Sequence, residues 1–140
     1  MGILVINTPV AAVTSTVPVA RTVNAVVFQV ARTEVASSVK LVLPADSTIL
    51  SIMREAVAAS DALTTAAVTL TVTSNGATIS TKSDDVKGSG AATAFVSMPS
   101  LPNPEPRPLV GDLLISAVYA ETGTASTVGG PWNYVVQYVR

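Results

Sequence analysis

The segment from Val39 to Ile52 constrains the fold most strongly, because it holds two apolar runs separated by a turn. The first run, Val39–Leu43, contains β-branched and aliphatic residues that favour an extended chain. Pro44 has no backbone N–H to donate to a sheet and its φ is fixed, so the first strand must end there. Asp46 has a short side-chain oxygen that bonds nearby backbone groups in turns. The segment therefore predicts a strand, a corner and a second strand that begins at Ile49.

Similar extended segments occur along the rest of the chain, each bounded by turn residues. The clearest is Ala67–Thr73, in which valine and leucine alternate with threonine, as in a strand with one buried face. It leads into Asn75-Gly76, a dipeptide that strongly predicts a hairpin because both residues tolerate positive φ. The predicted strands are Val23–Val30, Val35–Leu43, Ile49–Val57, Ala67–Thr73, Thr78–Thr81, Ala92–Met98, Leu109–Tyr119 and Asn133–Val139.

Some segments admit more than one interpretation. Met53–Ala59 also has the composition of a short helix, although we favour a strand there. Both faces of Val23–Val30 carry apolar residues, so we expect both to be at least partly covered. Lys82–Gly90 is polar and glycine-containing, and we expect an exposed loop. Pro99–Pro108 holds five prolines in ten residues, which favours a stiff polyproline segment on the surface.

Short strands with turn signals at intervals of about ten residues, and no convincing amphipathic helix, predict an all-β domain. The most probable architecture is an antiparallel β-sandwich or barrel. A chain that ends on a strand, as Asn133–Val139 does, is compatible with a jelly roll. We therefore expect a jelly-roll-like β-sandwich over residues 22–140, which form one domain of ordinary size.

Residues 1–21 differ from the rest in having two prolines and a single charged residue among Val, Thr and Ala. This composition favours an extended arm that lies along a neighbouring subunit or another surface as an added strand. A first strand of the same domain is an equally open interpretation. Met1–Pro9 lacks the positively charged start of a secretory signal, so we expect no export signal. The residues of the arm expected to contact a shell or a partner are Ile3, Val5, Val10, Val13, Val17 and Val19.

The residue types that perform most protein chemistry are missing from the chain. It has no histidine and no cysteine, which removes the usual general base, Ser-His-Asp systems, thiolate-bound zinc and haem ligation. The one adjacent acidic pair, Asp84-Asp85, has Lys82 and Lys87 nearby, so a solvated loop is favoured over a calcium site. The sequence predicts no enzyme, no cofactor and no metal site.

Other carboxylates and the C-terminal aromatics have both a structural and a functional interpretation. Asp46, Asp61, Asp112 and Glu121 each lie beside turn residues, which favours a role in turns over paired catalysis of glycoside hydrolysis. Trp132, Tyr134 and Tyr138 could stack on sugar rings, but Tyr134 and Tyr138 share a strand face with Val136. Packing in a core or an interface is therefore the favoured interpretation.

Composition points to self-association. Hydrophobic residues are 49% of the chain and charged residues 12%, yet no run reaches the roughly 20 apolar residues of a membrane span. The net charge of −1, with scattered Lys and Arg, argues against nucleic-acid binding. After one small core is filled, apolar residues remain, and we expect them to line a large permanent interface around a symmetry axis.

The chain resembles small virion proteins of tailed bacteriophages, namely capsid decoration (cement) proteins and head fibres. The resemblance is carried by the arm, the corner Val42–Ile49, the alternating strand Val68–Thr73 and the strand Gly111–Tyr119. It implies a homotrimer that binds the major capsid protein on the outside of the head, stabilises the shell, and is made in the bacterial cytoplasm. The alternative is a carbohydrate- or receptor-binding module of a head or tail fibre, using Trp132. A neck or tail component is also open.

Overall fold

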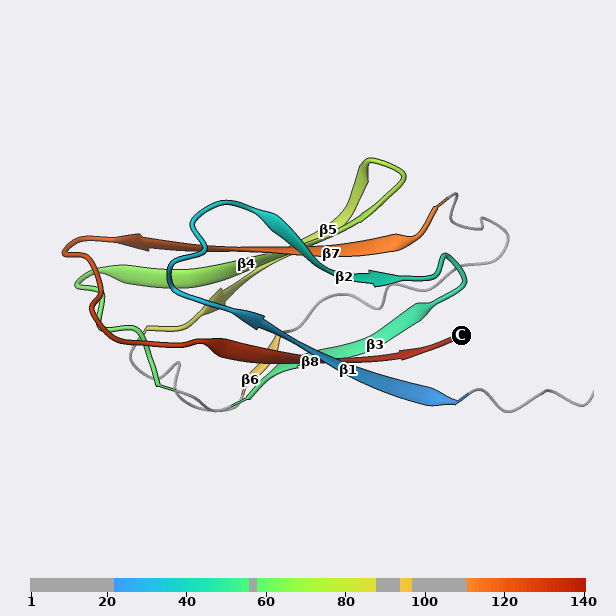
Figure 1. Ribbon diagram of the computed structural model, residues 1–140, viewed down its shortest axis with the longest axis horizontal. Coiled ribbons are helices and arrows are strands. Elements are labelled where there is room, and N and C mark those ends of the chain that lie inside the picture. Colours follow the sequence, from blue (N-terminus) through green and yellow to red (C-terminus); the bar gives the residue numbers. More distant parts are fainter. Residues whose placement is uncertain (1–21, 56–57, 88–93, 97–110) are drawn as a thin grey trace, which may run out of the picture.

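A computed structural model describes residues 22–55, 58–87, 94–96 and 111–140 (Figure 1). Within these ranges the secondary structure consists of β-strands, and no helix has the length and apolarity of a membrane span. The strands are β1 (Val23–Val30), β2 (Ser38–Leu43), β3 (Thr48–Arg54), β4 (Thr65–Ser74), β5 (Ala77–Asp85), β6 (Ala94–Val96), β7 (Leu113–Thr122) and β8 (Trp132–Val139).

The strands form two antiparallel sheets of four strands each. The first sheet has the order β1-β8-β3-β6 and the second has the order β2-β7-β4-β5. Figure 1 shows them as two layers, one above the other, in a β-sandwich-like arrangement. The predicted all-β class is thereby confirmed, and the inner strands are β8 and β3 in the first sheet and β7 and β4 in the second.

The predicted corner is present and carries the chain from one sheet to the other. β2 ends at Leu43, and the backbone N–H of Ser47 donates to the carbonyl of Pro44 at 2.9 Å. β3 then begins at Thr48 in the opposite sheet, where it pairs with β8. Because the two strands on either side of Pro44 belong to different layers, the corner holds the layers together covalently.

The core lies between the sheets and receives apolar side chains from both. Alternation in β4 buries Ala66, Val68, Leu70 and Val72, and the same alternation in β7 buries every second residue from Leu113 to Tyr119. Opposite them lie the buried side chains of β8, including Trp132 and Tyr134. The rings of Tyr119 and Trp132 stack across the sheets with centroids 5.3 Å apart. Such aromatic pairs add packing energy to the area they bury.

Two sequence-based predictions are wrong. The segment Lys82–Gly90 was expected to be an exposed loop, but β5 continues to Asp85 and Asp84 is buried. The strand Val23–Val30 was expected to be covered on both faces, but Val23, Val27 and their neighbours on one face are exposed. The reason for the second error is that β1 packs only one of its faces on the core, and no described strand covers the other. Residues 1–21 and Pro99–Pro108 lie outside the described residues.

The turn glycines differ in how much space surrounds them, which gives a testable contrast. Gly76 in the β4–β5 hairpin has φ +80 and nothing within 4 Å of an added Cβ. Gly129 has φ +125, and an added Cβ would lie 2.7 Å from Ser60 Cα. Gly76→Ala should therefore lower the free energy of unfolding by about 1–2 kcal/mol through backbone strain alone. Gly129→Ala should lower it more, and equal losses in urea denaturation would contradict this geometry.

Candidate functional site

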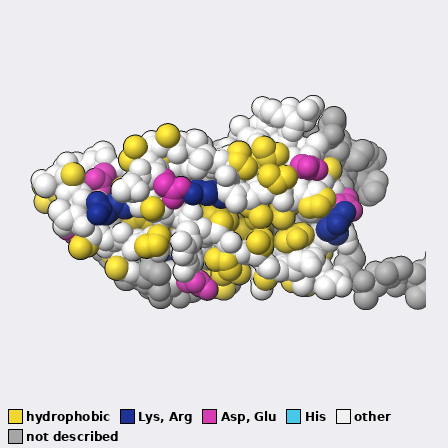
Figure 2. All heavy atoms as spheres, in the orientation of Figure 1, with side chains coloured by type: hydrophobic (Ala, Val, Ile, Leu, Met, Phe, Trp, Pro, Cys, Tyr) yellow, Lys and Arg dark blue, Asp and Glu magenta, His cyan; other side chains and the backbone are white. Residues whose placement is uncertain are grey.

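The two strands at one side of the molecule leave apolar side chains in solvent. β1 is the outer strand of the first sheet and β2 the outer strand of the second, and the two lie in contact on the same side. Figure 2 shows hydrophobic side chains gathered over the region where β1 and β2 run in Figure 1. Five valines of β1, β2 and the segment between these strands are each more than half exposed, and we call them the valine edge: Val23, Val27, Val35, Val39 and Val42. Large exposed apolar patches mark interaction surfaces.

The charges beside the valine edge are engaged within the chain. The Lys40 Nζ donates a hydrogen bond to the carboxylate of Glu34, and this bond holds the pKa of Glu34 below its usual value. The Arg32 Nη1 donates to the carbonyl of Ser126 at 3.0 Å. The strand β1 itself contains no charged residue. Binding of an apolar segment to this surface would therefore require little desolvation of charged side chains.

The edges of the two strands are protected to different degrees. β2 has a register shift between Val39 and Leu41, and it carries Lys40. Bulges and lysines are devices that discourage a further strand from pairing with an edge. β1 pairs with β8 in unbroken register from Val23 to Val30, without proline, charge or bulge. Among the described residues it has no second strand beside it. β1 is thus the open edge, able to bind an extended peptide through its main chain.

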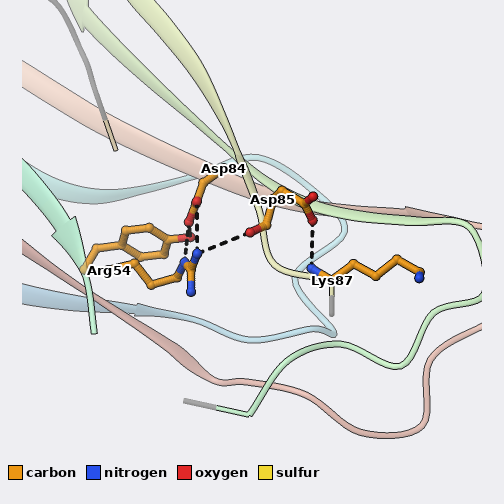
Figure 3. A network of polar contacts seen from close by, with 5 residues as sticks. Arg54, Asp84, Asp85 and Lys87 are labelled. Carbon is orange, nitrogen blue, oxygen red and sulfur yellow. Dashed lines mark hydrogen bonds and ion pairs between the residues drawn. The ribbon is translucent and has the colours of Figure 1, made fainter. Parts of the chain in front are cut away.

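A buried polar network ties the sheets together on the side away from β1 (Figure 3). Arg54 at the end of β3 donates from Nε to Asp84 Oδ2 at 2.6 Å and from Nη2 to Asp84 Oδ1 at 3.3 Å. The Nη2 also donates to the carbonyl of Asp85 at 3.2 Å. Tyr134 on β8 donates its hydroxyl to Asp84 Oδ2 at 2.8 Å. The strands β3 and β8 of the first sheet are thereby hydrogen-bonded to β5 of the second sheet.

The carboxylate of Asp84 is fully engaged in hydrogen bonds within this network. Both oxygens of Asp84 accept hydrogen bonds, and the residue is 7% exposed. Burial, reinforced by Asp84, raises the pKa of Tyr134 far above its usual value, so its hydroxyl stays protonated as a donor. Asp85 turns the other way and accepts from the Lys87 backbone N–H at 2.8 Å. The guanidinium beside Asp84 would repel a cation, and no group of three acidic residues in the described part of the chain could hold a metal ion.

A second polar cluster organises the loop between β7 and β8. The Tyr119 hydroxyl lies 2.8 Å from Ser60 Oγ and donates to Glu121 Oε2 at 2.5 Å. Glu121 Oε1 also accepts from the Ser126 backbone N–H at 3.1 Å. Asp61 accepts hydrogen bonds from the backbone N–H groups of residues 127 and 128 at 2.8 and 3.0 Å. These two carboxylates hold the loop in place through its backbone N–H groups.

The loop carboxylates predict a defined acid sensitivity. The hydrogen bond from Ser126 lowers the pKa of Glu121 below 4.5, and that from Val128 lowers the pKa of Asp61 below 3.8. A folded-state pKa below the unfolded value means that the stabilisation is complete above the unfolded pKa and is lost as pH falls through the folded one. We expect Glu121→Gln to flatten the fall in melting temperature below pH 4.5. Glu55→Gln, on the surface, is the control, and identical acid profiles for wild type and Glu121→Gln would contradict the prediction.

The structure separates the aromatic residues that the sequence grouped. Trp132 and Tyr134 are fully buried, so neither ring is available to a sugar on the surface of the described fold. Tyr138 is partly buried and packs against the edge of the core. The interpretation of Tyr134 and Tyr138 as packing residues agrees with these positions.

The carboxylates that were predicted to lie in turns have different surroundings in the structure. Asp46 receives a hydrogen bond from Arg140 Nε at 3.1 Å, and Asp112 is exposed beside the start of β7. The arm residues Ile3, Val5, Val10, Val13, Val17 and Val19 lie outside the described residues. The sequence analysis did not identify Arg54 or the open edge of β1. A lone arginine at the end of an apolar strand, and a strand without any charge, are the signals that pointed to them.

No protein-family model matches the chain, and no curated protein or solved structure shows significant similarity to it. Any assignment of function rests on the strand order, the valine edge and the resemblance in sequence pattern. The first two come from the described residues and the third from the sequence.

Proposed function

We propose that the chain is a structural virion protein of a tailed bacteriophage, a decoration (cement) protein that binds the outside of the head and stabilises the shell as a homotrimer. The fold supports this through its strand pairing. β1 pairs with β8, β2 with β7, β3 with β6 and β4 with β5. This nested antiparallel pairing, split over two four-stranded sheets, supports the inference that the domain is a jelly roll, an architecture common in viral capsid proteins.

The observation that carries the proposal is the valine edge beside the open strand β1. A monomer that keeps five valines more than half exposed gains free energy by burying them, at roughly 25 cal/mol per Å² of apolar surface. The same edge offers unpaired main-chain groups to a second chain. Contacts with other copies and with a capsid surface would use both features. A role in assembly follows from this surface, since it offers contact area and backbone pairing.

The mechanical function follows from multivalency. Each subunit of a homotrimer presents one shell-binding surface, and the three surfaces bind together because the first contact raises the effective concentration of the others. A trimer seated across the joints between capsid proteins would resist their separation under the pressure of packaged DNA. In this arrangement the arm, residues 1–21, contributes the contacts with the shell or with a neighbouring subunit.

Decoration of particles is the experiment that tests the proposal. Phage particles that lack this chain should bind the purified protein in a saturable way, and cryo-electron microscopy should locate it on the head exterior. The decorated particles should release their DNA at a higher temperature than undecorated ones. Particles that carry the chain only on the tail or neck, or no binding to heads, would contradict the proposal.

The alternative is a carbohydrate- or receptor-binding module of a head or tail fibre. Its contact would come from Tyr138, the one partly exposed residue among the three C-terminal aromatics. A glycan array probed with the purified chain and with Tyr138→Ala separates the two functions. Binding that depends on Tyr138 would favour the module over the decoration protein.

A further inference from the structure

We propose that residues 10–17 of one copy of the chain bind as an added strand to the β1 edge of a second copy. The inference rests on the homo-oligomer of the proposed function and names the segment and the surface that hold its subunits together. Each copy gives one segment and receives one, so the contact joins two different surfaces. Contacts of this kind close into rings, which include trimers.

The sequence of the segment matches what the β1 edge can accept. Pro9 and Pro18 enclose eight residues, Val10 to Val17, that contain no charge, glycine or proline. β1 is also eight residues long. In an extended chain Ala11, Val13, Ser15 and Val17 share one face, which is more apolar than the opposite face with Thr14 and Thr16. The prolines at both ends cannot donate to a ladder, and they would limit the added strand to these eight residues.

The position of the segment in the chain favours a second copy over its own β1. Val17 is separated from the start of β1 at Val23 by residues 18–22, Pro-Val-Ala-Arg-Thr. Segments that reverse the chain are rich in glycine, asparagine, aspartate and serine. The β4–β5 hairpin uses two of these types, Asn75 at φ 50 and Gly76 at φ 80. The linker before β1 has no such residue, so a tight reversal onto its own edge is disfavoured.

Distance and exposure are compatible with the exchange. The five residues 18–22 can span up to about 17 Å when extended, so residues 10–17 can lie away from the β1 strand of their own copy. An added strand also brings side chains beside Val23 and Val27, which are 55% and 53% exposed. One contact thus accounts for two features at once, the uncharged segment 10–17 and the unprotected edge. Pairing of β1 with β1 of another copy would leave the arm without a partner.

Engineered cysteines test the proposal directly because the natural chain has none. The full chain is prepared as two variants, Val13→Cys and Val27→Cys, and treated with a short bis-maleimide. We expect cross-linked dimers when the two variants are mixed, and few from either alone. Dimers from Val27→Cys alone would show pairing of β1 with β1 and overturn the proposal. Cross-links within single molecules of the double variant, confirmed by monomer mass, would show the segment folded back and also overturn it.

Edge lysines provide the second measurement. Val27→Lys places a charge on the β1 edge at an exposed position, and it should raise the dissociation constant of the oligomer at least about tenfold in sedimentation. Val128→Lys, at a residue of similar exposure in the loop between β7 and β8, is the matched control and should leave association unchanged. Circular dichroism verifies that both variants fold. An unchanged oligomer in Val27→Lys, or a wild-type chain that is monomeric at micromolar concentration, would overturn the proposal.

The purified chain is used without any particle, so the outcome is independent of shell binding. Failure of head decoration with intact arm exchange would contradict the proposed function alone. Decoration of heads by a chain without arm exchange would contradict the present inference alone.

Discussion

Arg54→Ala is expected to lower the free energy of unfolding by about 3–5 kcal/mol, because it leaves Asp84 charged, buried and without its cation. The Arg54 and Asp84 side chains are 3% and 8% exposed, so water cannot readily take the place of the guanidinium. The loss would be a large fraction of the 5–15 kcal/mol by which domains are typically stable. Urea denaturation followed by circular dichroism measures it.

Replacing all three side chains of the network tests whether the cost of Arg54→Ala comes from the buried charge that it leaves unpaired. Arg54→Met, Asp84→Leu and Tyr134→Phe together remove the charges and the tyrosine hydroxyl that binds Asp84. We expect the triple variant to be far more stable than Arg54→Ala, since no buried charge is left without a partner. Arg140→Ala is the control, because Arg140 and Asp46 are 56% and 58% exposed and such ion pairs contribute little. A loss in Arg54→Ala no greater than in Arg140→Ala would show that Asp84 is not held as described.

Trp132→Ala is expected to cost about 3–5 kcal/mol, because it removes the largest fully buried side chain from the core. The indole stacks on Tyr119 of the opposite sheet, so the cavity would lie between the layers. Trp132→Phe keeps an aromatic ring at this place and should cost less. It also removes the indole Nε1, which has no hydrogen-bond partner among the described residues. Circular dichroism is the appropriate probe, since the chain has a single tryptophan.

Comparison of the two variants also clarifies the glycan hypothesis. Loss of glycan binding in Trp132→Ala would follow from unfolding alone and is not evidence of contact. Trp132→Phe, if folded, should bind any glycan as the wild type does, because the ring lies inside the core. Equal stability of Trp132→Ala and wild type would contradict the buried position.

Much of the secondary structure could be predicted because it depends on local properties. Val68, Leu70 and Val72 alternate with threonines, and this period of two appears in the strand β4 with one face buried. Asn75-Gly76 marked the hairpin because both residues tolerate positive φ, and Pro44 marked the corner because its φ is fixed and it has no backbone N–H to donate. The predicted boundaries of β1 match the structure fully.

The polar end of β5 could not be predicted from local properties. Asp84 lies in a stretch whose composition is typical of a loop, and it is buried only because Arg54 and Tyr134 bind it from another sheet. The partners are 30 and 50 residues away in sequence. No pattern within Lys82–Gly90 indicates that Asp84 has these partners.

Extended segments, turns and the apolar faces of strands can be recognised in this chain from its sequence, because these properties depend on neighbouring residues. Which of the apolar faces are covered depends on how the sheets pack. Val27 and Val136 are valines of the neighbouring strands β1 and β8, yet Val27 lies on the exposed outer face of the first sheet and Val136 on the face that packs into the core. Burial depends on which face of a sheet another sheet covers, and that is set by contacts between distant segments rather than by any local pattern.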